Sequence, residues 1–252
     1  MDYRIDFTII CDRGKARAKN QDNFWCGGKY LESENNGLKE PLSASTTNKN
    51  TAALAVFDGI GGEKHGELAA YIAAKTFNDI YYNTEVGNAE QFLSQICLVM
   101  NEAICKYVKE KRTGNMGTTL AALLFKEDSI FSCNLGDSKI FRFNSGVLKQ
   151  VSYDHVLDTS TNKKPQLSQC LGIPEDDFII EPYITKIKYV DNDKYIICSD
   201  GLTDMVSEDE IRYILLKQEP VLKCCKELMD VALARGGNDN ITIIVCEIKE
   251  IS

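Results

Sequence analysis

The chain has 252 residues, of which 44% are apolar and 26% charged, the composition of an ordinary water-soluble protein. Its net charge of −8 and the lack of a Lys/Arg run argue against nucleic-acid binding, and no apolar stretch approaches the roughly 20 residues that span a bilayer. The N-terminus lacks the basic and apolar regions of a signal peptide, so we expect a cytoplasmic protein without nucleic-acid or membrane partners, and the charge favours a monomer.

The cysteines follow no ligand pattern. Ten are scattered along the chain without a Cys-x-x-Cys pair, and Cys198 and Cys246 lie inside apolar runs. This usage is typical of small buried hydrophobic residues in a reducing compartment. Only two histidines are present, without ligand spacing, so we expect no zinc site.

The first part of the chain predicts strands. Apolar and polar residues alternate from Tyr3 to Ile9, which is typical of a half-buried strand, and residues 24–31 are a second candidate. Residues 32–50 are polar and rich in Ser, Thr and Asn, which predicts a long exposed hairpin loop. Ala52 to Phe57 is a short apolar strand that ends at Asp58.

Two helices follow this strand. Apolar residues recur at three- to four-residue spacing from Ala69 to Ile80 and again from Phe92 to Val108. Each pattern has one apolar face, so we expect each helix to cover a sheet.

Short strand candidates dominate the next part of the chain. Turn residues separate the first four of them, which suggests an antiparallel meander, and the last two continue that sheet. The candidates are residues 119–125, 130–135, 139–143, 147–151, 178–188 and 194–199.

The C-terminal part predicts two helices and a strand. Ser207 and Glu210 form a capping-box pattern that opens one helix, and Pro220 suits the first turn of the next. Ile241–Ile248 is a nearly continuous apolar run, typical of a central strand. Strands in runs and helices in pairs favour an α+β fold of antiparallel sheets covered by helices. Without a linker or a repeat, we expect one domain over residues 1–252.

Aspartates in turns are the most informative feature of the sequence. Asp58 and Asp200 follow strand-like runs and precede glycine, Asp239 directly precedes such a run, and Asp22 lies in an Asn-Gln-Asp segment. Asp137, which follows Gly136, is a fifth candidate. Carboxylates at strand ends suit an oxygen-ligated divalent metal site, and two such metals suit hydrolysis of a phosphate ester.

The segment Asp58-Gly59-x-Gly61-Gly62 has a competing interpretation as a phosphate-binding loop. It lacks the lysine and hydroxyl residue of that loop, and its leading carboxylate would repel a phosphate. A cation held by Asp58 removes that repulsion, and glycine at position 59 lets a main-chain carbonyl approach the metal. Each aspartate alone fits an ordinary turn, so their combination and order carry the argument.

Six motifs in order resemble the metal-dependent type 2C (PPM) Ser/Thr protein phosphatases, most closely their bacterial single-domain members. The resemblance extends from about Thr8 to Glu247. The motifs are Arg17-x-x-Asn20-Gln21-Asp22, Asp58-Gly59-x-Gly61-Gly62 with Gly66-Glu67, Met116-Gly117-Thr118-Thr119, Leu135-Gly136-Asp137-Ser138, Cys198-Ser199-Asp200-Gly201-Leu202-Thr203-Asp204 and Gly237-x-Asp239-Asn240-Ile241-Thr242.

This resemblance implies a fold and an activity. The fold is a four-layer α/β/β/α sandwich, in which two mainly antiparallel sheets pack face to face with helices on both outer faces. The activity is hydrolysis of phosphoserine and phosphothreonine in proteins, by direct attack of a water that bridges two metal ions. The partners implied are a phosphorylated protein substrate and, in bacterial signalling, a Ser/Thr kinase or its targets.

The resemblance also implies a site of two to three Mn²⁺ or Mg²⁺ ions. Asp58 would bridge two ions, Asp200 and Asp239 would complete the protein ligands of the first, and the carbonyl of Gly59 would bind the second.

Three further roles follow from the same resemblance. Asp22 would orient a water on the metal or ligate through it. Asp137, with Asp200, would hold a more labile third ion. Arg17 would bind the substrate phosphate, and its planar guanidinium suits phosphoryl oxygens.

Three departures from the family pattern affect these expectations. Gln21 replaces a glutamate found in many members, so we expect a weaker hold on the second metal. Ile60 stands where animal members carry a histidine thought to act as general acid, so the leaving group must be protonated otherwise. Residues 156–164 replace a longer flap beside the cleft, so substrate selection does not transfer from relatives.

Two alternatives remain open at this point. Cys11 and Arg17 are separated by five residues, the spacing of cysteine-dependent phosphatases, although Ile10 replaces the usual preceding histidine. The chain could also be a catalytically inactive binding or regulatory module with the same fold, against which its intact carboxylates argue.

Overall fold

The structure is a computed structural model that describes residues 2–60, 65–157, 166–174 and 178–251. Two features discussed above fall partly outside the described residues. Gly61 and Gly62 are not described, and of the shortened segment 156–164 only Val156 and Leu157 are.

Sheet A has six strands in the order β3-β1-β12-β11-β8-β9, and all of its neighbouring strands pair antiparallel. It includes the strand predicted to be central, β12, which lies between β1 and β11. The strands are β1 (Asp2–Asp12), β3 (Leu42–Thr47), β8 (Lys139–Asn144), β9 (Val147–Gln150), β11 (Lys194–Cys198) and β12 (Ile241–Ile251).

Sheet B is antiparallel too, in the order β10-β7-β6-β4-β2, with the two-residue β5 paired to the end of β4. Its strands are β2 (Asp22–Cys26), β4 (Ala52–Ile60), β5 (Gly117–Thr118), β6 (Leu120–Lys126), β7 (Ser129–Leu135) and β10 (Tyr183–Lys188).

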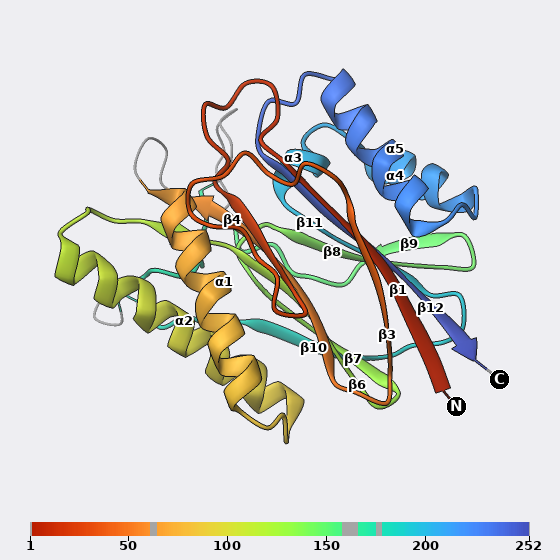
Figure 1. Cartoon of the computed structure of the whole chain (residues 1–252), viewed down its shortest axis with the longest axis horizontal. Helices are drawn as coiled ribbons and strands as arrows, with labels where there is room; N and C mark the ends of the chain where they lie inside the picture. Colours follow the sequence, from red (N-terminus) through yellow and green to blue (C-terminus); the bar gives the residue numbers. More distant parts are fainter. Residues whose placement is uncertain (1, 61–64, 158–165, 175–177, 252) are drawn as a thin grey trace.

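Helices cover the outer face of each sheet, as Figure 1 shows. The long helices α1 and α2 lie on sheet B, and α4 and α5 lie on sheet A near the short helix α3. The helices are α1 (Gly66–Asn83), α2 (Ala89–Lys111), α3 (Asp200–Thr203), α4 (Glu208–Leu216) and α5 (Val221–Ala234). This arrangement confirms the predicted sandwich.

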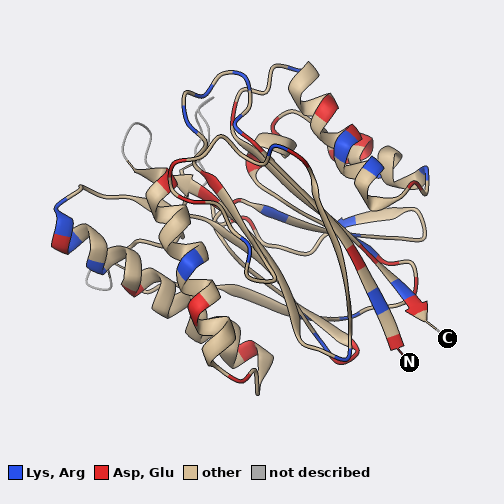
Figure 2. Ribbon diagram, in the orientation of Figure 1, with Lys and Arg blue, Asp and Glu red and all other residues tan. Residues whose placement is uncertain are grey.

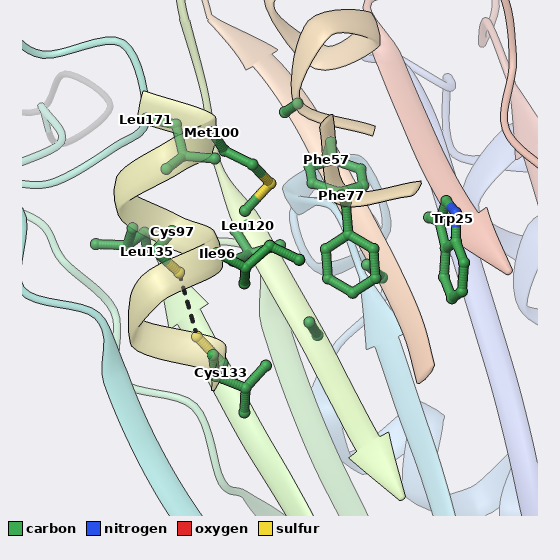
Figure 3. Close-up of a cluster of buried hydrophobic side chains, with 14 of the residues drawn as sticks. Trp25, Phe57, Phe77, Ile96, Cys97, Met100, Leu120, Cys133, Leu135 and Leu171 are labelled. Atoms are coloured by element: carbon green, nitrogen blue, oxygen red, sulfur yellow. Dashed lines mark hydrogen bonds between the residues drawn. The ribbon is translucent and has the colours of Figure 1, made fainter. Parts of the chain in front are cut away.

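The two-residue period of β4 explains why it can serve two apolar layers. Leu54 and Val56 face the core between the sheets, whereas Ala55 and Phe57 face the layer under α1 and α2. In that outer layer Phe57 packs near Phe77 of α1 (Figure 3). A strand that is buried on both faces has a continuous apolar sequence, as residues 52–57 do.

Several predicted elements need correction. Residues 32–50 are not only a loop, because β3 lies within them and pairs with β1. The predicted meander is wrong, since β6 and β7 belong to sheet B while β8 and β9 belong to sheet A. The two later strands, predicted to continue one sheet, are divided as well: β10 pairs with β7 in sheet B, and β11 pairs with β8 in sheet A. The sequence pattern shows where strands occur. It does not show which sheet a strand joins after each turn, and that decides its partner.

The connections also place one end of each sheet at the same end of the sandwich. β2, β8 and β12 begin there, and β4, β7 and β11 end there, because neighbouring strands run antiparallel. Acidic segments gather at this end in Figure 2, next to basic segments of the loop between β1 and β2. The predicted site residues therefore lie on strand ends that meet.

The cysteines behave as predicted. All ten lie among the described residues, none of them forms a disulfide, and eight are buried. Cys97 of α2 and Cys133 of β7 lie 3.7 Å apart at Sγ inside the outer core of sheet B (Figure 3). Among the described helices, none is long and apolar enough to cross a membrane.

Candidate metal centre

Four of the predicted aspartates surround the fifth, Asp58. Asp22 opens β2 directly opposite Asp58 of β4, Asp200 opens α3 after β11, Asp239 precedes β12, and Asp137 lies in the turn from β7 to β8. Burial raises the pKa of Asp58 well above its usual value, and the charges of Asp200, Asp22, Asp137 and Asp239 raise it further. Carboxylates from both sheets therefore form one strongly negative cluster.

Asp22 is the most buried carboxylate of the cluster. Ser199 Oγ and Thr242 Oγ1 each donate a hydrogen bond of 2.7 Å to its Oδ2. Its Oδ1 is also buried but has no hydrogen-bond partner in the described part of the chain. Burial raises the pKa of Asp22 to about 7, against the lowering effect of the two hydroxyls. An unpaired buried carboxylate oxygen is costly unless a cation or a water completes it.

The main chain of Asp58 is fixed by two threonines. Thr119 Oγ1 accepts from the Asp58 amide at 3.0 Å, and Thr118 Oγ1 donates to the Asp58 carbonyl at 2.9 Å. Thr119 Oγ1 also shares a 2.7 Å hydrogen bond with Ser138 Oγ, next to Asp137. These contacts explain why the Gly117-Thr118-Thr119 motif accompanies the aspartates.

At two points of the centre, glycine allows two main-chain segments to pack closely against each other. A Cβ on Gly59 would lie 2.3 Å from the carbonyl oxygen of Gly66 and 2.5 Å from that of Gln21. A Cβ on Gly201 would lie 2.0 Å from the carbonyl oxygen of Asn240. Both positions exclude any side chain, so glycine keeps these segments together.

Asn240 holds the loop that carries Arg17. Its Nδ2 donates to the carbonyls of Arg13 and Lys19 at 2.8 and 2.9 Å, and its Oδ1 accepts from the Gln21 amide at 2.8 Å. Because both the oxygen and the nitrogen of its side-chain amide form hydrogen bonds, Asn240 fixes residues 13–21 against the start of β12.

Arg17 lies at the rim of the cluster. Its Nη2 donates to Asp239 Oδ2 at 2.7 Å, and 46% of its side chain is exposed. The hydrogen bond to Asp239 raises the pKa of the guanidinium, so it stays charged. A charged guanidinium beside an acidic cluster can bind an anion that reaches the same rim.

Gln21 takes part in a different contact from the one its family position implies. Its Nε2 donates to Glu67 Oε2 at 3.1 Å, while Lys19 Nζ pairs with Glu67 Oε1 at 2.8 Å. Burial raises the pKa of Glu67, but the hydrogen bonds from Lys19, the main chain and Gln21 outweigh it and leave the pKa below its usual value. Glu67 therefore remains ionised and joins α1 to the Arg17 loop.

The turn that carries Asp137 is held by His155. Gly136 has a left-handed φ of 98°, its amide donates to His155 Nδ1 at 3.3 Å, and its carbonyl accepts from the His155 amide at 3.0 Å. Burial lowers the pKa of His155, which favours the neutral ring whose Nδ1 can accept. The sequence offered no role for this histidine.

The donors of the cluster fit Mn²⁺ or Mg²⁺, which are hard ions that prefer oxygen ligands. The unpaired Oδ1 of Asp22 leaves an oxygen that can face an ion. The lack of a side chain at Gly59 leaves room for its main chain to act as a ligand. Within the described residues, no three His, Cys, Asp or Glu side chains are already close enough to share an ion. Asp239 is instead paired with Arg17.

Cys11 is not placed to be a nucleophile. It is fully buried in the core between the sheets, and burial and the nearby Asp22 raise the pKa of its thiol to about 12. Its Sγ accepts from Asn20 Nδ2 at 3.3 Å and lies 3.2 Å from Thr242 Oγ1, whose proton is donated to Asp22. A nucleophilic cysteine requires an accessible thiolate, so the spacing to Arg17 has no catalytic meaning.

The structure thus brings together every aspartate predicted for the site, with Arg17 at its rim and Gly59 at its edge. Besides His155, sequence reasoning missed five residues that hold the aspartates or the Arg17 loop. The missed positions are Thr118, Thr119, Ser199, Asn240 and Thr242. All lie inside the quoted motifs, so their adjacency to the aspartates was the available signal.

Comparison with known proteins gives relatives over nearly the whole chain. A serine/threonine phosphatase (stp) of Listeria monocytogenes is 28% identical over 258 residues, covering 94% of this chain and 93% of the relative. The serine/threonine protein phosphatase PstP of Mycobacterium tuberculosis is 27% identical over 257 residues, covering 98% of this chain and 45% of that protein.

A solved structure agrees with these relatives. The crystal structure of the PstP catalytic domain in complex with two manganese ions is similar with a TM-score of 0.79 and 26% identity, covering 98% of this chain and 100% of that one. The family model for protein phosphatase 2C matches residues 41–241, which include all the predicted aspartates except Asp22. The chain therefore belongs to the protein phosphatase 2C family.

Proposed function

We propose that this chain is a metal-dependent phosphoprotein phosphatase that hydrolyses phosphoserine and phosphothreonine. The observation that carries the proposal is the cluster of carboxylates around Asp58, with a buried unpaired oxygen on Asp22 and a charged Arg17 at the rim. Membership of the protein phosphatase 2C family supports the same reaction class.

We propose the ligand roles that the family resemblance implies, and the position of each group supports them. Asp58, at the middle of the cluster, would bridge two ions, with Asp200 and Asp239 completing the first and the carbonyl of Gly59 binding the second. Asp22 lies deepest and would act through an ordered water.

Two further groups lie at the edge of the cluster. Asp137, in the turn held by His155, would contribute to a third and more labile ion together with Asp200. Because a carboxylate that ligates a cation no longer attracts the guanidinium as strongly, metal loading at Asp239 would release Arg17 for the substrate phosphate.

The bound ions supply Lewis acidity and neutralise the charge of the phosphoryl group. The chain itself binds and orients: Arg17 donates to phosphoryl oxygens, and Asn240 keeps the Arg17 loop in place. Ile60 offers no proton to the leaving alkoxide, so that proton would come from solvent.

The reaction is tested with the purified chain after removal of metals by a chelator. We expect no hydrolysis of para-nitrophenyl phosphate or a phosphothreonine peptide until Mn²⁺ or Mg²⁺ is restored. Activity that survives excess chelator and disappears with a thiol alkylator would point to Cys11. No hydrolysis under any metal condition would favour an inactive binding module.

We further propose that residues 1–252 act as one catalytic domain, as a monomer in the cytoplasm, on a phosphorylated protein that a Ser/Thr kinase modifies. The net charge of −8 supports the monomer. Light scattering of the purified chain would test it, and phosphoproteomics of a deletion strain would identify the substrate.

A further inference from the structure

Exposed apolar side chains are concentrated in one stretch of the chain, which begins near the His155 that holds the Asp137 turn. Among the described residues, six of the fourteen large apolar side chains that are exposed lie between Tyr153 and Tyr183. Single exposed apolar residues are common, but a group of them beside a site indicates a binding surface. The six are Tyr153, Val156, Leu157, Phe178, Ile179 and Tyr183.

Two of them form a defined pair, which we call the aromatic platform. The rings of Tyr153 and Tyr183 lie 5.7 Å apart at 41°, and the two residues are 61% and 40% exposed. The ring of Tyr153 also contacts that of His155 edge-on, with centroids 5.5 Å apart. Aromatic rings held in contact while exposed offer apolar area with little loss of side-chain entropy on binding.

Asn134 of β7 holds both tyrosines of the platform. Asn134 donates from Nδ2 to the Tyr153 carbonyl at 2.6 Å and accepts at Oδ1 from the Tyr153 amide at 3.0 Å. Tyr183 pairs directly with Asn134 in the ladder between β10 and β7. One residue thus sets the position of both tyrosines, so the platform is preformed.

The same strand end connects the platform to the metal centre. Asn134 lies three residues before Asp137, and His155, against which Tyr153 packs, holds Gly136 from both its amide and its carbonyl. An extended peptide advances about 3.3 Å per residue, so side chains about two to four positions from a bound phosphoresidue would lie roughly 7–13 Å from it. Three residues of chain separate Asn134 from Asp137, at most roughly 10 Å when extended, which is comparable with that spacing along a bound substrate.

We propose that the aromatic platform binds an aromatic or large aliphatic side chain of the substrate, located about two to four residues from the phosphorylated Ser or Thr. This inference rests on the proposed phosphatase function. A substrate peptide is favoured as the occupant because the platform is aromatic, preformed and connected through Asn134 and His155 to the turn that carries Asp137.

The test compares two phosphothreonine peptides that differ at one position. One carries a single Phe, placed in turn at each position about two to four residues on either side of the phosphothreonine, and the other carries Ala there. The measured quantity is the ratio of kcat/KM for the Phe peptide to that for the Ala peptide. We expect the wild type to favour one Phe peptide by about tenfold, the effect of burying one aromatic side chain.

Variants assign that preference to the platform. Tyr153→Ala and Tyr183→Ala should each reduce the ratio towards one, whereas Tyr153→Phe should retain it, because the ring and not the hydroxyl makes the contact. Tyr213→Ala is the matched control, since Tyr213 is 64% exposed on α4, where its ring contacts Lys217, and should keep the wild-type ratio. A general disturbance of the centre affects both peptides and cancels in the ratio.

The outcomes separate this inference from the proposed function. Hydrolysis of both peptides without a Phe preference, or a preference that survives both alanine variants, would overturn the platform and leave the phosphatase function intact. Failure of the wild type to hydrolyse any phosphopeptide or para-nitrophenyl phosphate with Mn²⁺ present would overturn the function itself.

Discussion

The two sides of the metal centre are built differently. On one side Asp22 and Asp58 face each other across paired strands, with Ser199, Thr242 and Thr119 bonded to their side chains or main chain. On the other side Asp137 lies in a three-residue connection between the sheets, held through His155. The strand side can fix ligand positions closely, whereas the turn side borders an exposed surface and can vary with the substrate.

The strand side carries unfavourable electrostatic energy. Burial and neighbouring carboxylates raise the pKa values of both Asp22 and Asp58. Removing a charge from water costs several kcal/mol unless it is paired, so divalent ions offset this cost when they bind. We therefore expect substitutions on the strand side to have larger effects than those on the turn side.

Asp58→Asn should have the largest effect. Since Asp58 is central to the cluster, its loss should lower kcat/KM for para-nitrophenyl phosphate with Mn²⁺ by about three or more orders of magnitude. Asp230→Asn, at an exposed position of α5, is the matched control and should leave activity unchanged. Activity of Asp58→Asn within about tenfold of wild type would show that the strand side is not the core of the centre.

The pH dependence of stability tests the burial of Asp22. Its pKa is about 7 in the folded chain, because of burial, and near 3.8 when unfolded, so the folded state binds the proton more tightly. In chelator, the free energy of unfolding should therefore fall as the pH rises from about 4 to about 7, with Asp22 contributing at most about 4 kcal/mol.

Asp22→Asn removes that titration and keeps an oxygen that Ser199 and Thr242 can donate to. Urea unfolding at several pH values should show a smaller decrease for this variant than for wild type, with Asp58 accounting for the remainder. An identical pH profile in the two proteins would mean that Asp22 does not titrate in this range.

Asp137→Asn should have a smaller effect, because the ion proposed for the turn side is the more labile one. We expect kcat/KM to fall by about tenfold at limiting Mn²⁺ and to recover as Mn²⁺ is raised. A metal titration of the activity measures both. A loss as large as that of Asp58→Asn, without recovery, would remove the distinction between the two sides.

Sequence reasoning reached the aspartates but not their supports. Asp58 and Asp200 stand out because glycine follows each at a strand end, and motif order related them to a known family. The hydrogen bonds of Asn240 span more than two hundred residues, which local patterns do not record. For the same reason periodicity located β7 and β8 but could not show that the chain changes sheets between them.

The smallest expected effect is that of Gln21→Glu, which separates metal affinity from stability. A second carboxylate would replace the hydrogen bond to Glu67 with repulsion, so the chelated protein should lose about 1 kcal/mol of stability. The added negative charge should lower the half-saturating Mn²⁺ concentration by about threefold, equivalent to less than 1 kcal/mol. Gln21→Ala loses the same hydrogen bond without adding charge, so it should destabilise the protein without tightening metal binding. Equal Mn²⁺ affinity in all three proteins would place position 21 outside the metal centre, and its contact with Glu67 would then serve only to hold α1 against the Arg17 loop.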